Sequence, residues 1–317
     1  MRSSIAVVIP VFNREKLVIR ALESAVGQTL LPAEIIVVDN ASSDESYANV
    51  EKWIAEHQTI DVPMRLIKET HPGAAAARNA GLREVTAEYV CFLDSDDMLA
   101  PELMSEASKE IAANGRLCDL ICWQTAEVCT TGQKKRKAFH DDMFKSQIYQ
   151  SRICTQTFAV RTKFLRDIGG WNASLRCWDD WELGVRLLVH NPRLRQVDKV
   201  LSIIYPQRIS ITGENHYSKA GEWEKAIDAA EADVEGMPDE KKLRGMINYR
   251  RLNLAALYKR EGRSDLAEPL RQKALTHPSV NRSRRLMLNL IYHYTARGGR
   301  GGYLMYEAIR DKRIRDK

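Results

Sequence analysis

Three carboxylates stand within four consecutive residues of this chain, at Asp94, Asp96 and Asp97, with Ser95 between them. They follow the apolar run EYVCFLD, which is typical of a buried β-strand. Like charges this close together at the end of a buried strand are costly to ionise unless a positive group compensates them. Mg2+ and Mn2+ do this well, because hard cations prefer carboxylate oxygens and substrate phosphates. The cluster therefore indicates a metal and phosphate site, with a turn or helix N-cap as the alternative reading.

A second acidic pair, Asp179 and Asp180, lies between Trp178 and Trp181. The dipole of a helix favours acids in its first turn, which explains one aspartate better than two. Aromatic faces are common stacking surfaces for sugars, so the flanking tryptophans point to a carbohydrate.

The first hundred residues alternate between strand and helix patterns. The apolar segments predict buried strands at residues 5–12, 33–40, 64–69 and 88–94. Helices are expected between them, at residues 15–29, 46–57 and 73–84. This alternation predicts an α/β fold whose parallel sheet is covered on both faces. Ligands bind such sheets at the carboxyl ends of the strands, where Asp39 and Asp94 both stand, so we expect one shared crevice.

The middle of the chain is mixed. We expect helices at residues 101–114 and 178–190 and a strand at 119–128. The apolar stripe of the second helix contains Trp181, Val185 and Leu188. The polar segment TTGQKKRKAFHDD, residues 130–142, predicts a mobile loop.

From about residue 219 onward the pattern predicts helices only. Residues 253–278 resemble a single tetratricopeptide hairpin, without a second copy at the expected spacing. The tail, residues 282–317, has ten Lys/Arg and three Asp/Glu, which gives +7 (10 − 3) in a chain of net charge +6. Its amphipathic segment 284–294 suits a membrane surface or a partner helix, and a solvated helix face is the alternative.

The bulk composition limits the class of protein. The 317 residues are 44% hydrophobic and 28% charged, as in ordinary globular proteins. No apolar stretch approaches the roughly 18 residues that cross a membrane, and no secretory signal is visible. The six cysteines form no CxxC pair, so buried free thiols are expected. We expect a cytoplasmic protein, possible contact with the inner face of the membrane, and no nucleic-acid partner.

Five segments, in this order, resemble the successive motifs of family 2 glycosyltransferases. They are IAVVIPVFNRE, EIIVVDNASSD, HPGAAAARNAGL, YVCFLDSDDML and IGGWNASLRCWDDWELGVRL, and they span roughly residues 1–210. The resemblance implies a GT-A fold. It divides the chain into a glycosyltransferase domain, residues 1–215, and a helical C-terminal region, residues 216–317. Within the first domain, residues 1–100 would bind the nucleotide and residues 101–215 the acceptor.

The resemblance also implies a nucleotide-sugar site. The turn after the first strand lies against the base in this family, which corresponds to Pro10, Val11, Phe12 and Asn13. Asp39 matches the aspartate that accepts a hydrogen bond from uracil or thymine, and a carboxylate is chemically apt for an imide N–H. Three further positions complete the predicted donor site: Arg78, Asp94 and Ser95.

The family pattern assigns the metal and the base as well. Asp96 is the first candidate metal ligand, with Asp94 or Asp97 beside it, for Mg2+ or Mn2+. Asp180 matches the catalytic base of the E-D-x-E-L motif, in which Asp179 replaces the first glutamate. The resemblance implies that Trp178, Asp179 and Trp181 bind the acceptor.

One departure concerns a histidine that helps to hold the metal in many relatives. The matching stretch here is YPQRISITGENHYSK, residues 205–219. Gln207 or Arg208 takes the expected place, and His216 follows later. The resemblance therefore predicts the fold more firmly than it predicts the metal ligands.

Together these features predict an inverting, metal-dependent, hexosyltransferase-like enzyme. We expect a UDP-sugar as donor, with a TDP-sugar as second choice. The acceptor would be a hydroxyl of a cell-envelope polysaccharide or lipid-linked glycan. The alternatives are a nucleotidyltransferase, which usually has an early Gly-rich loop, and a nucleotide-binding scaffold with an inactive core.

Overall fold

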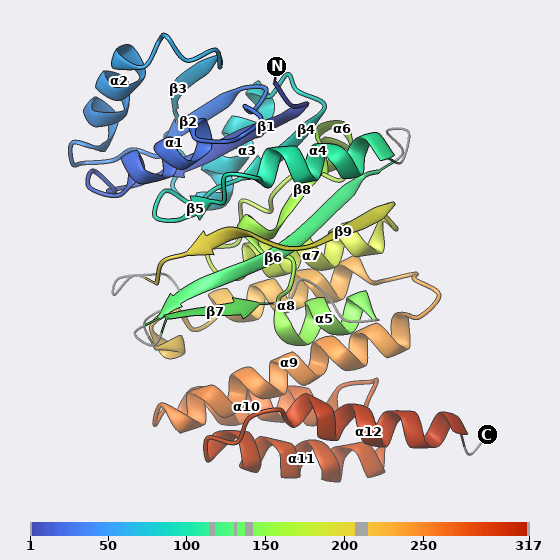
Figure 1. Cartoon of the computed structure of the whole chain (residues 1–317). Helices are drawn as coiled ribbons and strands as arrows, with labels where there is room; N and C mark the ends of the chain where they lie inside the picture. Colours follow the sequence, from blue (N-terminus) through green and yellow to red (C-terminus); the bar gives the residue numbers. More distant parts are fainter. Residues whose placement is uncertain (1, 114–117, 130–131, 137–141, 207–214, 316–317) are drawn as a thin grey trace. The chain divides into compact units, whose positions relative to one another are not determined.

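A computed structural model describes residues 2–113, 118–129, 132–136, 142–206 and 215–315. The chain divides into two compact units (Figure 1). The first contains Met1–Gln147 and Ser151–Arg208, and the second contains Ile148–Gln150 and Ile209–Lys317. The alternating pattern and the all-helical pattern of the sequence thus belong to different units.

The first unit is built on a mixed sheet whose order is β3-β2-β1-β4-β8-β6-β9-β5, with β7 paired to β6. Its first four strands are parallel neighbours: β3 (Met64–Lys68), β2 (Ile35–Asp39), β1 (Ile5–Val11) and β4 (Tyr89–Phe92). Every residue of β1, β2 and β4 is buried, because helices cover both faces. The expected parallel, doubly covered sheet is confirmed in this half.

The two faces of β1 belong to two hydrophobic cores. Odd-numbered residues such as Val7 pack with α1 (Val18–Val26), α2 (Ser46–Glu56) and α4 (Leu103–Ala113). Even-numbered residues such as Val8 pack with α3 (Ala74–Glu84). The contact with α3 is close, since a Cβ on Gly81 would lie 2.4 Å from Cγ1 of Val8.

The other half of the sheet is mostly antiparallel. β8 (Phe158–Arg161) runs antiparallel to β4 and to β6 (Leu120–Cys129), and β9 (Leu194–Ile204) runs parallel to β6. β5 (Met98–Leu99) follows the acidic cluster directly and pairs with β9. Helices α5 (Met143–Gln150), α6 (Thr162–Asp167) and α7 (Asp179–Val189) complete the chain's middle part.

One sequence prediction is wrong in this half. Within the segment expected to be a mobile loop, Gly132–Arg136 forms β7, an antiparallel partner of β6. A Lys/Arg-rich strand has no apolar alternation to reveal it, and such charges are typical of strands at a sheet edge. Residues 130–131 and 137–141 lie outside the described part of the chain.

The second unit is helical. After η2 (His216–Lys219) come α8 (Glu222–Asp233), α9 (Glu240–Arg260), α10 (Ser264–Thr276), α11 (Arg282–Ala296) and α12 (Gly302–Arg315). Helix α9 packs against α8, α10 and α11, and its residues Leu254, Ala255 and Tyr258 are buried. The helical C-terminal region is confirmed, while its resemblance to a tetratricopeptide unit stays a prediction.

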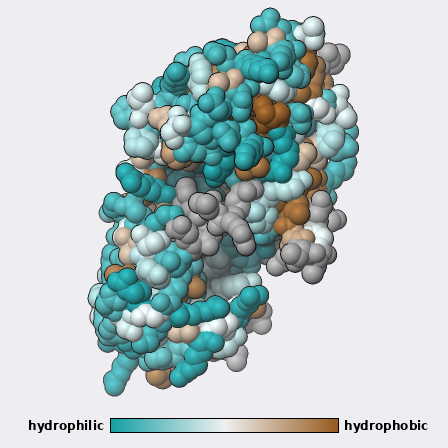
Figure 2. Space-filling model, turned by 90° about the vertical axis from the view of Figure 1, so that its left-hand side faces the viewer, coloured by the Kyte–Doolittle hydropathy of each residue, from teal (hydrophilic) through white to brown (hydrophobic). Residues whose placement is uncertain are grey.

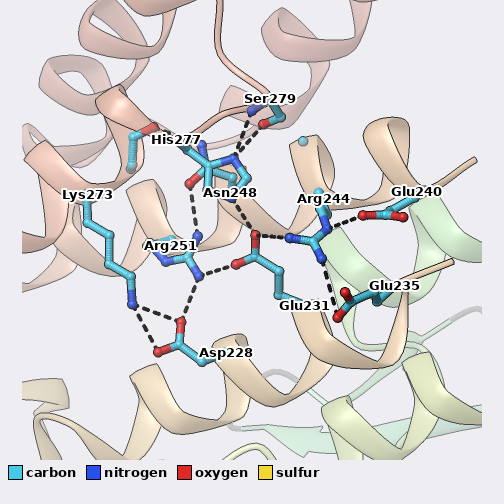
Figure 3. Close-up of polar contacts among 12 residues, drawn as sticks. Asp228, Glu231, Glu235, Glu240, Arg244, Asn248, Arg251, Lys273, His277 and Ser279 are labelled. Carbon is cyan, nitrogen blue, oxygen red and sulfur yellow. Dashed lines mark hydrogen bonds and ion pairs between the residues drawn. The ribbon is translucent and has the colours of Figure 1, made fainter.

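Ion pairs join the helices of the second unit in addition to apolar packing (Figure 3). Arg251 of α9 is 1% exposed, and its Nη2 lies 2.8 Å from Oδ1 of Asp228 and 2.6 Å from Oε2 of Glu231, both on α8. Lys273 of α10 also binds Asp228, and His277 beyond α10 binds Glu231. Each of these two acids therefore has at least two cationic or hydrogen-bonding partners.

The surface seen in Figure 2 is largely hydrophilic, with small separate hydrophobic areas. Among the described residues, no helix is both long and apolar enough to cross a membrane.

Candidate active site

The ends of β1 and β2 carry the predicted base-binding residues. Val11 and Asp39 are register partners in adjacent parallel strands, so Pro10, Val11 and Asp39 lie at one sheet edge. Asn13 turns the chain with φ 51°, a left-handed conformation that asparagine tolerates. Its Oδ1 accepts a hydrogen bond of 2.8 Å from the backbone N–H of Ser43, which ties the two loops together.

Two side chains at this edge are candidates to contact a ligand. Phe12 is 56% exposed, which is unusual for a phenylalanine. Asp39 is buried; its Oδ2 accepts a 3.3 Å bond from the N–H of Ser42, while its Oδ1 has no hydrogen-bond partner among the residues that the structure describes. A buried acceptor without a partner is costly, and a donor N–H from a ligand would relieve that cost.

Arg78 joins the two acidic clusters that the sequence placed about 85 positions apart. It lies on α3, is buried, and has one nitrogen 2.8 Å from Oδ1 of Asp94 and another 2.8 Å from Oδ2 of Asp179. Its guanidinium also stacks over the ring of Trp171, 4.4 Å from the ring centroid. Burial alone would lower the pKa of Arg78, but Asp94 and Asp179 outweigh it and raise that pKa.

Gln156 binds two members of the first acidic cluster. Its Nε2 lies 2.5 Å from Oδ2 of Asp94 and 2.5 Å from Oδ2 of Asp97. Oδ1 of Asp97 accepts a 2.8 Å bond from the N–H of Tyr205. Burial, followed by the negative charge of Asp94, nevertheless raises the pKa of Asp97 to about 8. Burial and the charge of Asp94 thus outweigh the hydrogen bond from Tyr205 and the positive charge of Arg20, which both act to lower the pKa of Asp97.

Asp96 lies closest to the two arginines at the start of the chain. Its Oδ2 is 3.5 Å from Nε of Arg14, and Nη2 of Arg20 donates to its backbone carbonyl. Arg20 is held in place by the ring of Tyr205, 3.9 Å from the guanidinium carbon. Burial and then the charge of Asp94 raise the pKa of Asp96. Ser95, between these acids, is buried.

The donor atoms of this cluster fit a hard divalent cation, and Asp94 and Asp96 are the members with partly exposed carboxylates. The described residues contain no group of three or more His, Cys, Asp or Glu arranged to hold a metal. Such a cation would therefore rest on one or two carboxylates and on phosphates of a bound nucleotide, as Mg2+ often does.

The second acidic pair opens α7, directly after Trp178 in a left-handed conformation (φ 54°). Burial, followed by the negative charge of Asp179, raises the pKa of Asp180 to about 7. Trp178 is partly exposed. Trp181 is fully buried on the apolar stripe of α7, so its ring offers no face to a sugar. This corrects the expectation that Trp181 binds the acceptor.

The sequence did not predict the part that Gln156 plays in the site. Gln156 lies in the short turn η1 (Thr155–Thr157), and no motif marks it. Of the candidates to replace the family's metal-binding histidine, Gln207 and Arg208 lie outside the described residues. His216 belongs to the second unit, where its Nδ1 lies 2.7 Å from Oε1 of Glu261.

The sequence model of the family described as "Glycosyl transferase family 2" matches residues 6–169, just over half of the chain. The chain belongs to glycosyl transferase family 2. The matched range contains the turn after β1, Asp39, Arg78, the acidic cluster and Gln156. The pair Asp179 and Asp180 lies just beyond it.

Curated relatives resemble part of the chain. It is 29% identical over 163 residues to an uncharacterized glycosyltransferase of Rickettsia felis, a match that covers 50% of the chain. The chain spans 25% of that relative's length, and 15% and 32% of two further relatives that it matches.

Solved structures support the fold over nearly the whole chain. TarS 1–349 of S. aureus, in complex with UDP-GlcNAc, has a TM-score of 0.71 at 19% identity, covering 94% of this chain and 88% of that one. The mannosyltransferase PcManGT from Pyrobaculum calidifontis, in complex with GDP-Man and Mn2+, has a TM-score of 0.59 at 18% identity, covering 93% and 84%. At such identities the likeness establishes the GT-A fold, as the sequence predicted.

Proposed function

We propose that this family 2 protein is an inverting, metal-assisted glycosyltransferase that moves a sugar from a UDP-sugar to a hydroxyl acceptor. The observation that carries the proposal is the position of Arg78, whose guanidinium binds both Asp94 and Asp179. Asp94, from the cluster suited to bind a metal ion and a diphosphate, and Asp179, beside the acid suited to proton transfer, thereby contact the same buried arginine. That is the arrangement a displacement at a sugar diphosphate needs.

The donor is inferred from the unsatisfied acceptor at the end of β2. Oδ1 of Asp39 has no partner within the described part of the chain, and the imide N–H of uracil is a donor of the right kind. Thymine offers the same group, which keeps a TDP-sugar as second choice. The UDP-GlcNAc complex of TarS, a protein of the same fold, supports a UDP-sugar.

The leaving diphosphate needs positive charge. Arg14, Arg20 and Arg78 lie around the acidic cluster and would orient and stabilise it. Mg2+ or Mn2+ held by Asp96 with Asp94 or Asp97 would neutralise further charge there. The Mn2+ complex of PcManGT is consistent with this cofactor.

Asp180 would act as the general base. At neutral pH, about half of a carboxyl group with a pKa of about 7 is deprotonated and can accept a proton. Its affinity for that proton is also higher than that of an ordinary carboxylate, which suits a general base. The acceptor oxygen bonds to the anomeric carbon, its proton passes to Asp180, and the bond from that carbon to the diphosphate breaks on the opposite side. One such displacement inverts the anomeric configuration. Trp178 and Asp179 would position the acceptor.

The acceptor would be a cell-envelope polysaccharide or a lipid-linked glycan, used on the cytoplasmic side of the membrane. The family resemblance and the basic C-terminal tail support this part of the proposal.

The test is release of UDP from candidate donors by wild-type protein and by Asp180→Asn. We expect the variant to lose about 100- to 10,000-fold in kcat while it keeps its affinity for UDP, because only proton transfer is removed. Asp167→Asn is the matched control: it removes one carboxylate charge from an exposed ion pair of the first unit. Normal turnover by Asp180→Asn would contradict the base assignment. UDP binding without turnover by the wild-type protein would contradict the enzyme itself.

A further inference from the structure

Exposed apolar side chains gather at the C-terminal end of the second unit. Among the described residues, seven large hydrophobic side chains are exposed, and five of them belong to α11 and α12. These five, Leu286, Leu290, Tyr294, Leu304 and Met305, are here called the α11–α12 apolar surface. Leu286 is 67% exposed, and Leu290 and Leu304 are each 60% exposed. The concentration is too strong to be the scattered exposure that ordinary surfaces show.

The geometry makes this surface continuous. Leu286, Leu290 and Tyr294 recur every four residues, so they lie on one face of α11. The ring of Tyr294 lies where a side chain on Gly299 would be, 2.4 Å from an ideal Cβ. Leu304 Cδ1 comes within 3.7 Å of an ideal Cβ on Gly301. Apolar side chains of both helices, Tyr294 of α11 and Leu304 of α12, therefore border the glycine turn between them.

The sequence around the surface is strongly positive, with ten Lys/Arg in residues 282–317 against Glu307, Asp311 and Asp316. Residues 279–306 contain five arginines and no aspartate or glutamate. Arg282, Arg285, Arg297 and Arg300 are exposed beside the apolar side chains. Leucine and tyrosine on one face with arginines at its margins is the pattern of a helix that lies in a membrane interface.

We propose that the α11–α12 apolar surface docks onto an anionic lipid membrane. The leucines would enter the boundary between headgroups and acyl chains, and the arginines would reach lipid phosphates. A second copy of the chain is a poorer occupant, because a symmetric contact would bring arginines against arginines. The inference does not rest on the proposed transferase function, since lipid binding needs neither donor nor acceptor.

The experiment is flotation of the full chain with vesicles of phosphatidylcholine alone and with vesicles containing about one third phosphatidylglycerol. Wild-type protein is expected to float with the anionic vesicles and to be released by high salt, because salt screens the arginine contribution. Leu286→Gln with Leu290→Gln removes apolar contacts while keeping helix-forming residues. Arg282→Gln with Arg297→Gln removes charge, and a loss of roughly fivefold per arginine, about 25-fold for the pair, is expected.

Matched controls separate the surface from general effects. Lys52→Gln with Lys163→Gln removes two exposed cations from the first unit, and Tyr217→Gln removes an exposed aromatic ring elsewhere in the second. Both controls should float like wild type, and all variants should keep the wild-type unfolding temperature. The proposal is overturned if wild-type protein stays unbound, or if the surface variants float as the controls do. It is also overturned if the leucine variant splits an oligomer of the wild-type protein in light scattering, which would assign the surface to a second copy.

Discussion

Each unit of the molecule contains a cluster of acids around a buried arginine, and the two clusters differ in how fully their charge is compensated. In the second unit, hydrogen bonds from His277 and Arg251 outweigh the effect of burial and lower the pKa of Glu231 to about 2. In the first unit, burial and neighbouring acids raise the pKa of Asp97 to about 8 and that of Asp180 to about 7. Carboxylate anions are thus stabilised in the second unit and destabilised in the first.

The difference follows from the charge of the partners. Glu231 is contacted by Arg251, Arg244 and His277 (Figure 3), so its charge is matched within the protein. In the first unit Arg78 is shared between Asp94 and Asp179, and Asp97 accepts its hydrogen bonds from two neutral donors, Gln156 and the N–H of Tyr205. A cluster whose acids are neutralised by cations of the protein holds helices together. A cluster whose acids lack such cations can bind a ligand that carries positive charge, such as a metal ion.

The largest expected effect tests the matched cluster. Arg251→Met should lower the free energy of unfolding of the second unit by about 3 kcal/mol, because it removes two charge-assisted hydrogen bonds that the buried guanidinium donates to Asp228 and Glu231 of α8. Chemical denaturation followed by circular dichroism measures this. Arg263→Met is the control, since Arg263 pairs with Asp265 on the surface and should change stability by less than about 0.5 kcal/mol. Equal effects of the two substitutions would remove the distinction between the clusters.

The next effect tests the undercompensated cluster. UDP with Mn2+ at about one hundred times its dissociation constant should stabilise the wild-type protein by about 2.7 kcal/mol, because it binds only the folded state. Thermal unfolding is the measurement, with UDP alone and Mn2+ alone for comparison. Asp96→Asn should abolish the extra stabilisation that Mn2+ gives to UDP. If the variant gains as much as wild type, Asp96 is not a metal ligand.

The smallest effect is the pH dependence of turnover. Asp180 must be deprotonated to accept a proton, so kcat should be constant well above pH 7 and fall about tenfold per unit below it. A pH–rate profile with saturating donor measures this inflection. Asp167→Asn should leave the inflection in place. A profile that is flat between pH 5 and 8 would contradict a base with a raised pKa.

Much of this arrangement followed from the sequence because parallel strands end at one edge. The apolar runs located β1, β2 and β4, and their ends brought Pro10, Asp39 and Asp94 to the same side of the sheet. Arg78 could be proposed from its motif, but its simultaneous contact with Asp94 and Asp179 required the fold.

The rest depended on contacts that no local pattern encodes. Gln156 reaches the acidic cluster from a three-residue turn, and its neighbours show no period. Two predictions included Trp181: one as a stacking surface for a sugar, the other as part of the apolar stripe of α7. Trp181 is fully buried, so it packs as part of the stripe. The strand β7 is rich in lysine and is defined by its pairing with β6.

The close contact between Gly81 and Val8 has a consequence for the protein's tolerance of change. Gly81 lies one turn beyond Arg78 on α3, and the missing methyl group lets that helix rest directly on β1. The distance between α3 and β1 thus determines the position of the Arg78 guanidinium relative to the carboxylates of Asp94 and Asp179. Val8, a buried core residue of β1, therefore helps to fix the position of Arg78, and a larger side chain at residue 81 would shift the guanidinium relative to Asp94 and Asp179.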